Sequence, residues 1–136
     1  MSAEIKLRLP LPPSTNSLHV GNSDGGKHRS KSYSRWLSQA GLIARSQMIG
    51  KHGFGKADVV VDVTCQVPLD RKGRPIPCDV DNMTKATLDL MQAIGVYAND
   101  RTVEELRVRR YRGDQRFGYD MDVTVNLLDD EQESLF

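Results

Sequence analysis

The chain has 136 residues, with 19 Lys and Arg, 18 Asp and Glu, a formal net charge of +1 and two cysteines. This length suits one domain with a modest core. No apolar run is long enough to span a membrane, and residues 1–10 lack a signal-peptide pattern. Two cysteines exclude a disulfide framework, and no Cys/His spacing fits zinc. We therefore expect a cytosolic, reduced protein.

The net charge hides an uneven distribution. Residues 129–136 contain four acidic residues and no basic one, so the rest of the chain has 19 basic against 14 acidic residues, a net +5. Residues 25–57 contain no acidic residue. This stretch suits a polyanionic partner, and it equally suits a solvated loop and helix face. Its basic residues and histidines are Lys27, His28, Arg29, Lys31, Arg35, Arg45, Lys51, His52 and Lys56.

The first half of the chain predicts a strand, a loop and a helix. Apolar and polar residues alternate over residues 5–9, which indicates a strand that Pro10 ends. Residues 14–30 are rich in Gly, Ser and Asn and predict a long loop. Residues 33–49 follow helical spacing, and Gly50 ends this helix. Its apolar stripe consists of Trp36, Ala40, Ile43, Ala44 and Met48.

A second strand and a second helix follow. Residues 59–67 alternate strongly between valines and polar residues, as in a half-buried strand. Residues 70–77 predict a basic loop marked by Gly and Pro. A helix is expected from about Asp81 to Ile94, with Gly95 as its C-cap.

Two more strands complete the predicted fold. They cover residues 102–112, where arginines interleave with apolar residues, and residues 119–127. The order β-α-β-α-β-β predicts an α+β fold with a mixed β-sheet covered by two main helices. We expect one domain over residues 1–128 and a flexible acidic tail over residues 129–136.

Two carboxylates one residue apart, Asp79 and Asp81, lie where an extended segment runs into the second predicted helix. Lys85 follows one helical turn later, and Asp100 lies in the turn after the helix. Hard cations such as Mg²⁺ prefer a few carboxylate oxygens, a substrate phosphate and water. A helix start adds N–H groups and a positive dipole end that favour phosphate. The cluster therefore predicts metal-dependent phosphodiester chemistry.

A purely structural interpretation of these residues is also open. Asp81 suits an N-cap, and Asp100 suits a turn. Residues four apart share a helix face, so Asp81, Lys85 and Asp89 could form an exposed ladder of ion pairs. For Asp89 we favour this interpretation. For Asp79, Asp81, Lys85 and Asp100 together, the structural interpretation leaves their spacing as a coincidence.

Several spaced motifs agree with one family. They are Asp79-x-Asp81-Asn82-x-x-Lys85, Asp100 followed by Val103, Pro12-Pro13-Ser14-x-Asn16 and Tyr33-x-x-Trp36. Over residues 9–125 the chain thereby resembles the RusA-type Holliday junction resolvases. Members of that family are small α+β homodimeric endonucleases that use Mg²⁺ to cut symmetrically across four-way DNA junctions.

The resemblance implies roles for individual residues. Asp79, Asp81 and Asp100 correspond to the essential carboxylates and are expected to hold Mg²⁺, with Mn²⁺ as a substitute. Lys85 corresponds to the lysine that supports catalysis. Where the family often has Asp-Asp, this chain has Asn99-Asp100. Asn99 removes one negative charge beside the expected metal, and the assignment of Asp100 stands.

Basic side chains outside the motif are expected to hold the phosphates that flank the junction. A homodimer with two-fold symmetry would place one site on each of two opposed strands. The expected DNA-binding residues are Asn16, Lys27, Arg29, Lys31, Arg71, Lys72, Arg74, Arg107 and Arg109.

Two rival functions stay open. One is a metal-dependent nuclease acting on other branched or single-stranded DNA, because selectivity for DNA structure depends on the geometry of the dimer. The other is a non-catalytic junction-binding protein with a decayed site, which the presence of all three acidic residues and the lysine disfavours. The favoured interpretation is a bacterial or phage-encoded resolvase that acts in recombination and repair.

The C-terminal residues carry a separate motif. Gln132-Glu133-Ser134-Leu135-Phe136 resembles the Gln-x-x-Leu-Phe peptide with which bacterial DNA enzymes bind the replicative sliding clamp. In such peptides the Leu and Phe fill an apolar pocket and the Gln hydrogen-bonds beside it. Gln132, Leu135 and Phe136 are thus candidate partner-binding residues. A match this short arises readily by chance, and an acidic end that only solubilises the protein or shields the DNA site is the alternative.

Overall fold

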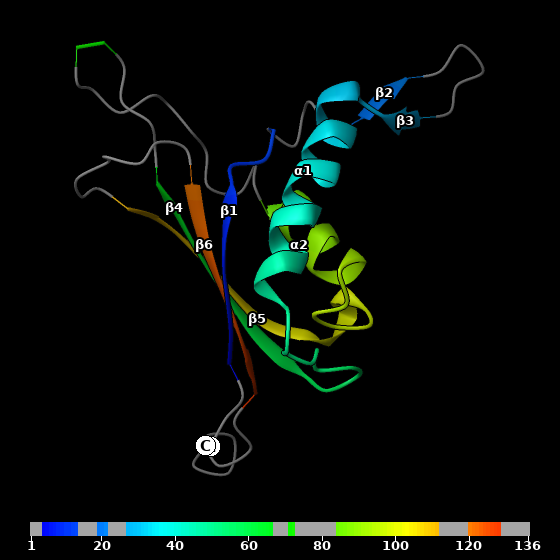
Figure 1. The fold of residues 1–136 in the computed structure, drawn as a ribbon, viewed down its shortest axis with the longest axis vertical. Helices are drawn as coiled ribbons and strands as arrows, with labels where there is room; N and C mark the ends of the chain where they lie inside the picture. The colour runs from blue at the N-terminus through cyan, green and yellow to red at the C-terminus, as the bar shows by residue number, and fades with distance from the viewer. Residues whose placement is uncertain are drawn as a thin grey trace.

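The structure is a computed structural model that describes residues 4–13, 19–21, 27–66, 71–72, 84–111 and 120–128 (Figure 1). A mixed four-stranded sheet runs in the order β1-β6-β4-β5. Strands β4 and β5 pair in parallel, and β6 pairs antiparallel with both β1 and β4. The four strands are β1 (Glu4–Pro10), β4 (Val59–Gln66), β5 (Val103–Tyr111) and β6 (Asp120–Leu127).

Two helices lie side by side on one face of this sheet (Figure 1). Helix α1 (Lys31–Gln47) begins at Ser30, whose hydroxyl caps the helix by accepting a hydrogen bond from the backbone N–H of Tyr33. Helix α2 (Thr84–Ala93) is followed by Gly95, which adopts a φ of 82° that L side chains rarely tolerate. The predicted α+β class is therefore confirmed.

The alternation seen in the sequence separates the two faces of the sheet. Residues on the helix-covered face are fully buried, including Leu7, Val61 and Val123, whereas their neighbours along each strand are partly or fully exposed. Tyr33, Trp36, Ala40 and Ala44 of α1 pack onto this core together with Ala86, Leu90 and Met91 of α2. A period of two in the strands and of 3.6 in the helices explains both patterns.

Side-chain contacts tie α1 to strand β1 at the edge of the sheet. The amide of Gln47 accepts a hydrogen bond from the backbone N–H of Arg8 at 2.8 Å and donates one to its carbonyl oxygen at 2.8 Å. The indole N–H of Trp36 donates to the carbonyl of Pro10 at 3.0 Å. Gln47 thus covers one backbone position of an edge strand that would otherwise be open to pairing.

Several element boundaries differ from the predictions. The segment predicted as a loop over residues 14–30 contains a short two-stranded ladder of β2 (His19–Gly21) and β3 (Lys27–Arg29), beside the N-terminal end of α1 (Figure 1). Helix α1 begins and ends two residues earlier than predicted. The expected start of the second helix at Asp81 and the acidic tail lie outside the described residues. No described helix combines the length and the apolar character that crossing a membrane requires.

Candidate active site

Helix α2 presents one face to the core and another to solvent. Ala86, Thr87, Leu90 and Met91 are buried, whereas Lys85 and Gln92 are exposed and Asp89 is half-buried. Lys85, Asp89 and Gln92 are spaced at i, i+4 and i+7, so they share one side of the helix. We refer to the side of α2 that carries these three residues as the outer face.

Asp100 is brought to this outer face by a hydrogen bond. Its backbone N–H donates to the Oε1 atom of Gln92 at 3.1 Å. Asp100 opens a short 3-10 helix, η3 (Asp100–Thr102), that contacts α2, and its carboxylate is exposed. The structure thus binds the backbone of Asp100 to the side of α2 that carries Lys85, about two helical turns from that lysine. Sequence reasoning missed Gln92, because an exposed glutamine on a helix carries no signal of its own.

Asn99 stabilises the turn that holds Asp100. Its side-chain oxygen accepts a hydrogen bond from the backbone N–H of Arg101 at 2.9 Å, and its carbonyl accepts the Thr102 hydroxyl at 2.9 Å. An asparagine at this position therefore acts as the N-cap of η3. The Asn99 side chain therefore stabilises this turn. An amide oxygen fills that role without the second carboxylate that the family often has at this position.

Tyr97 lies buried beneath the turn and also belongs to this region. Its hydroxyl donates to the carbonyl of Leu88 at 2.8 Å. Burial raises the pKa of the Tyr97 phenol far above its usual value, and the negative charges of Asp100 and then Asp89 raise it further. Tyr97 thus stays protonated, and both carboxylates lie near the same hydroxyl.

Asp89 corrects one expectation. Its Oδ2 atom accepts a hydrogen bond from the hydroxyl of Tyr33 on α1 at 2.8 Å. Within the described part of the chain, no ion pair joins Asp89 to Lys85. Asp89 thus has a structural contact, as the favoured interpretation expects, but its partner is Tyr33 on α1 and not Lys85.

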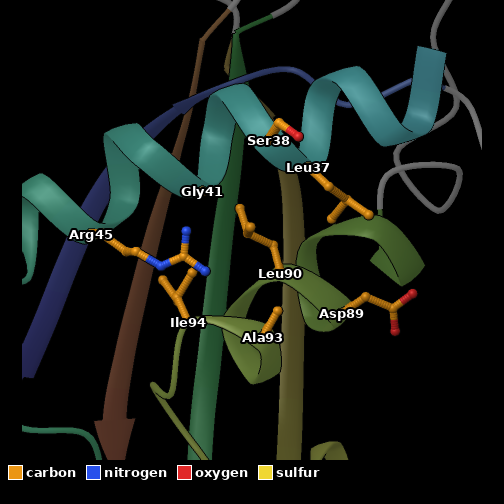
Figure 2. Close-up of a pocket in the computed structure, with 8 residues that line it drawn as sticks. All are labelled: Leu37, Ser38, Gly41, Arg45, Asp89, Leu90, Ala93 and Ile94. Carbon is orange, nitrogen blue, oxygen red and sulfur yellow. The ribbon is translucent and has the colours of Figure 1, made fainter. Parts of the chain in front are cut away.

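A shallow groove of about 250 Å³ runs between α1 and α2 beside this contact (Figure 2). Its floor is apolar, and Arg45 and Asp89 lie toward opposite ends of it. The residues lining it are Leu37, Ser38, Gly41, Arg45, Asp89, Leu90, Ala93 and Ile94.

The remaining predicted residues are dispersed. Arg107 and Arg109 of β5 point to the sheet face opposite the helices, because Leu106 and Val108 between and beside them pack on the core. Both arginines contact Asp62 of β4 at 3.4 Å, and the Asp62 side chain is only 22% exposed. The structure therefore separates these arginines from the outer face of α2 and partly neutralises them.

The basic residues nearer the chain's first half lie elsewhere. Lys31 is the exposed first residue of α1, and Lys27 and Arg29 belong to β3 beside it. Arg71 and Lys72 are exposed in a turn. The other predicted site residues lie outside the described residues: Asn16, Arg74, Asp79, Asp81, Gln132, Leu135 and Phe136.

Of the three predicted metal ligands, only Asp100 lies among the described residues. Among them, no group of three or more His, Cys, Asp or Glu side chains is arranged to hold a metal ion. Asp100 offers an exposed carboxylate on a turn anchored at both its cap and its backbone N–H. Carboxylate oxygen is the ligand type that Mg²⁺ prefers. The chemistry of Asp100 therefore fits such a site, and the other two carboxylates expected for it precede α2 in the sequence.

Comparison with known proteins supplies the family. A search of curated proteins gave no match. Residues 10–123 match the family model described as Endodeoxyribonuclease RusA, which spans both helices, η3 and strands β4 and β5. RusA nucleases are Holliday junction-resolving hydrolases that generally depend on a divalent metal. Because the match covers most of the chain, the chain belongs to the RusA family of endodeoxyribonucleases.

Proposed function

We propose that this nuclease uses Mg²⁺ to resolve four-way DNA junctions by paired symmetric nicks, in recombination and repair in the bacterial cytoplasm. The observation that carries the proposal is that Lys85 and Asp100 are both exposed, Lys85 on the outer face of α2 and Asp100 in the turn whose backbone binds Gln92 of the same face. Neither residue has a structural partner for its charged group among the described residues. Exposed, unpaired charges of opposite sign beside a family motif suit phosphate and metal respectively.

The proposed roles follow from the chemistry of each side chain. Asp79, Asp81 and Asp100 would hold the Mg²⁺. The bound ion would polarise the scissile phosphate and activate a water molecule. The ammonium of Lys85 would bind the scissile phosphate and offset the negative charge that develops on it. Gln92 would keep Asp100 oriented through its backbone N–H.

Junction cutting is tested with a synthetic mobile four-way junction, a replication fork and a linear duplex, each with and without Mg²⁺. The proposal expects paired nicks on the junction alone, and only with metal. Equal cutting of the fork would instead favour a nuclease for branched DNA in general. Junction binding without any cutting in Mg²⁺ or Mn²⁺ would favour a non-catalytic protein.

We further propose that the protein is a homodimer, as symmetric cleavage requires. Two large apolar side chains seven residues apart support a contact through α1 and the turn after it, because Leu42 is 70% and Ile49 is 81% exposed. Sedimentation at micromolar concentration should show a dimer, and Leu42→Glu should dissociate it. A wild-type species of only the 15.2 kDa chain mass would contradict the proposal.

The C-terminal motif supports a separate proposal, that the nuclease binds the bacterial sliding clamp through Gln132, Leu135 and Phe136. Such docking would recruit the enzyme to replicating DNA and leave its chemistry unchanged. Calorimetry with the clamp should detect binding that a Leu135→Ala/Phe136→Ala variant loses. Junction cutting should not change in that variant. The proposal would be contradicted if the wild-type protein did not bind the clamp, or if the double variant bound it equally well.

A further inference from the structure

Tyr33 connects the two helices at a point next to the proposed site. It lies in the first turn of α1, is only 1% exposed and packs beside Trp36, with ring centroids 6.3 Å apart. Trp36 is itself anchored to the carbonyl of Pro10. The ring of Tyr33 is therefore held firmly, and its hydroxyl meets the Oδ2 atom of Asp89 at 2.8 Å.

Asp89 is placed in the sequence where its carboxylate can compete with a DNA phosphate for the ammonium group of Lys85. The two residues are four apart on α2, a spacing at which opposite charges come within reach of each other. An ammonium paired with Asp89 would be less available to a phosphate. In the structure no such pair forms between these two described residues, and Asp89 binds Tyr33 instead.

We propose that Tyr33 is a positioning residue of the nuclease site: its hydroxyl holds Asp89 toward α1 and thereby keeps Lys85 unpaired for the DNA phosphate. This inference rests on the proposed function of Lys85. The hydroxyl is the essential group, because it is a neutral donor that satisfies the carboxylate without adding a competing cation.

The surroundings of Asp89 support this role. The negative charges of Asp89 and of Asp100 both raise the pKa of the buried Tyr97 hydroxyl, so the two charges act at a common point beside α2. A free Asp89 carboxylate in that region would attract Lys85, the cation closest to it in the helix. Holding Asp89 toward α1 directs the lysine away from a pairing that contributes nothing to cleavage.

The test asks whether a second substitution, Asp89→Asn, restores the cleavage rate that Tyr33→Phe lowers. Tyr33→Phe removes one oxygen and releases Asp89, so single-turnover junction cleavage at saturating enzyme should slow about two- to fivefold, the range expected when an exposed ion pair competes for the lysine. Adding Asp89→Asn removes the competing charge and should restore the rate. Asp89→Asn alone retains an acceptor for Tyr33 and serves as the matched control.

A role confined to packing predicts different results. If Tyr33 merely joined the helices, the Tyr33→Phe/Asp89→Asn double variant would remain as slow as Tyr33→Phe, and this outcome would overturn the inference. An unchanged rate in Tyr33→Phe would overturn it as well. Thermal melting of each variant separates loss of folding from loss of rate. Lys85→Ala tests the underlying function independently, because a wild-type rate in that variant would refute the role of the lysine itself.

Discussion

Gln92 and Asp100 are joined by a hydrogen bond from the backbone N–H of Asp100 to the side-chain oxygen of Gln92, 3.1 Å away. The bond connects the last turns of α2 to the turn that follows it. It ties the backbone of Asp100 to the helix face that carries Lys85. Under the proposed function, these two residues, fifteen apart in the sequence, would serve one site.

Loss of this bond should loosen the proposed metal ligand. Gln92→Ala is expected to raise the Mg²⁺ concentration needed for half-maximal cleavage and to slow cleavage about two- to tenfold, as loss of one hydrogen bond suggests. Gln39→Ala, an exposed glutamine on α1, is the matched control. Equal Mg²⁺ dependence in the two variants would show that Gln92 does not position Asp100.

The carboxylates themselves should be indispensable for cutting. Asp→Asn at Asp79, Asp81 or Asp100 is expected to abolish cleavage, because each substitution removes a charged ligand of the metal. Junction affinity should be equal or tighter, since a negative charge near phosphate is lost. Binding assays in Ca²⁺ and cleavage assays in Mg²⁺ measure the two effects separately. Wild-type cutting by Asp81→Asn would show that the site is wrongly assigned.

Lys85 should affect turnover more than binding. Lys85→Ala is expected to lower the single-turnover rate strongly while junction affinity changes little, because one lysine is a small part of the total phosphate contact. A lysine that only paired with neighbouring acids on the surface would contribute about 0.3–0.5 kcal/mol to stability and leave the rate unchanged. Rates at saturating enzyme distinguish the two cases.

The arginines of β5 give a prediction about DNA affinity. Arg107→Ala/Arg109→Ala should weaken junction binding and reduce the salt dependence of binding by about one unit per lost phosphate contact. Asp62→Asn should do the opposite, because it removes the acidic partner that both arginines share, while Arg107 keeps its ion pair with Glu105 at 3.1 Å. Fluorescence anisotropy over a salt series measures both. Unchanged affinity in both variants would show that this sheet face stays clear of DNA.

Gly53 and Gly41 should differ in how well they tolerate substitution by alanine. A Cβ at Gly53 would lie 1.9 Å from the carbonyl oxygen of Gly95, so Gly53→Ala should destabilise the fold by about 1–3 kcal/mol. At Gly41 the nearest atom is the tip of the Arg45 side chain at 3.4 Å, and alanine favours helices by about 1 kcal/mol. Gly41→Ala should therefore melt at or above the wild-type temperature. A Gly53→Ala protein that melts like wild type would contradict this close packing.

The sequence alone was sufficient for the element order and for the α+β class. Strict alternation in β1, β4 and β6 and a single apolar stripe in α1 leave few alternatives, because each period is a direct consequence of local backbone geometry. The motif that contains Asp79, Asp81 and Lys85 could be recognised because its residues are close together in the chain, and the roles of these residues stay a prediction. Boundaries were less accurate: α1 begins at Lys31 because Ser30 caps it, a local contact that competes with the apolar pattern.

Only the tertiary structure decided which side chains meet. In the sequence, Asp89 was assigned to the surface of the second helix and Tyr33 to a motif at the start of the first helix, and only the packing of α1 on α2 joins them. Arg107 and Arg109 were predicted from the sequence as DNA-binding residues, which stays a prediction, and strand pairing places them beside Asp62 on the sheet face opposite the helices. Contacts between residues distant in the chain depend on register and on helix packing, which no local pattern specifies.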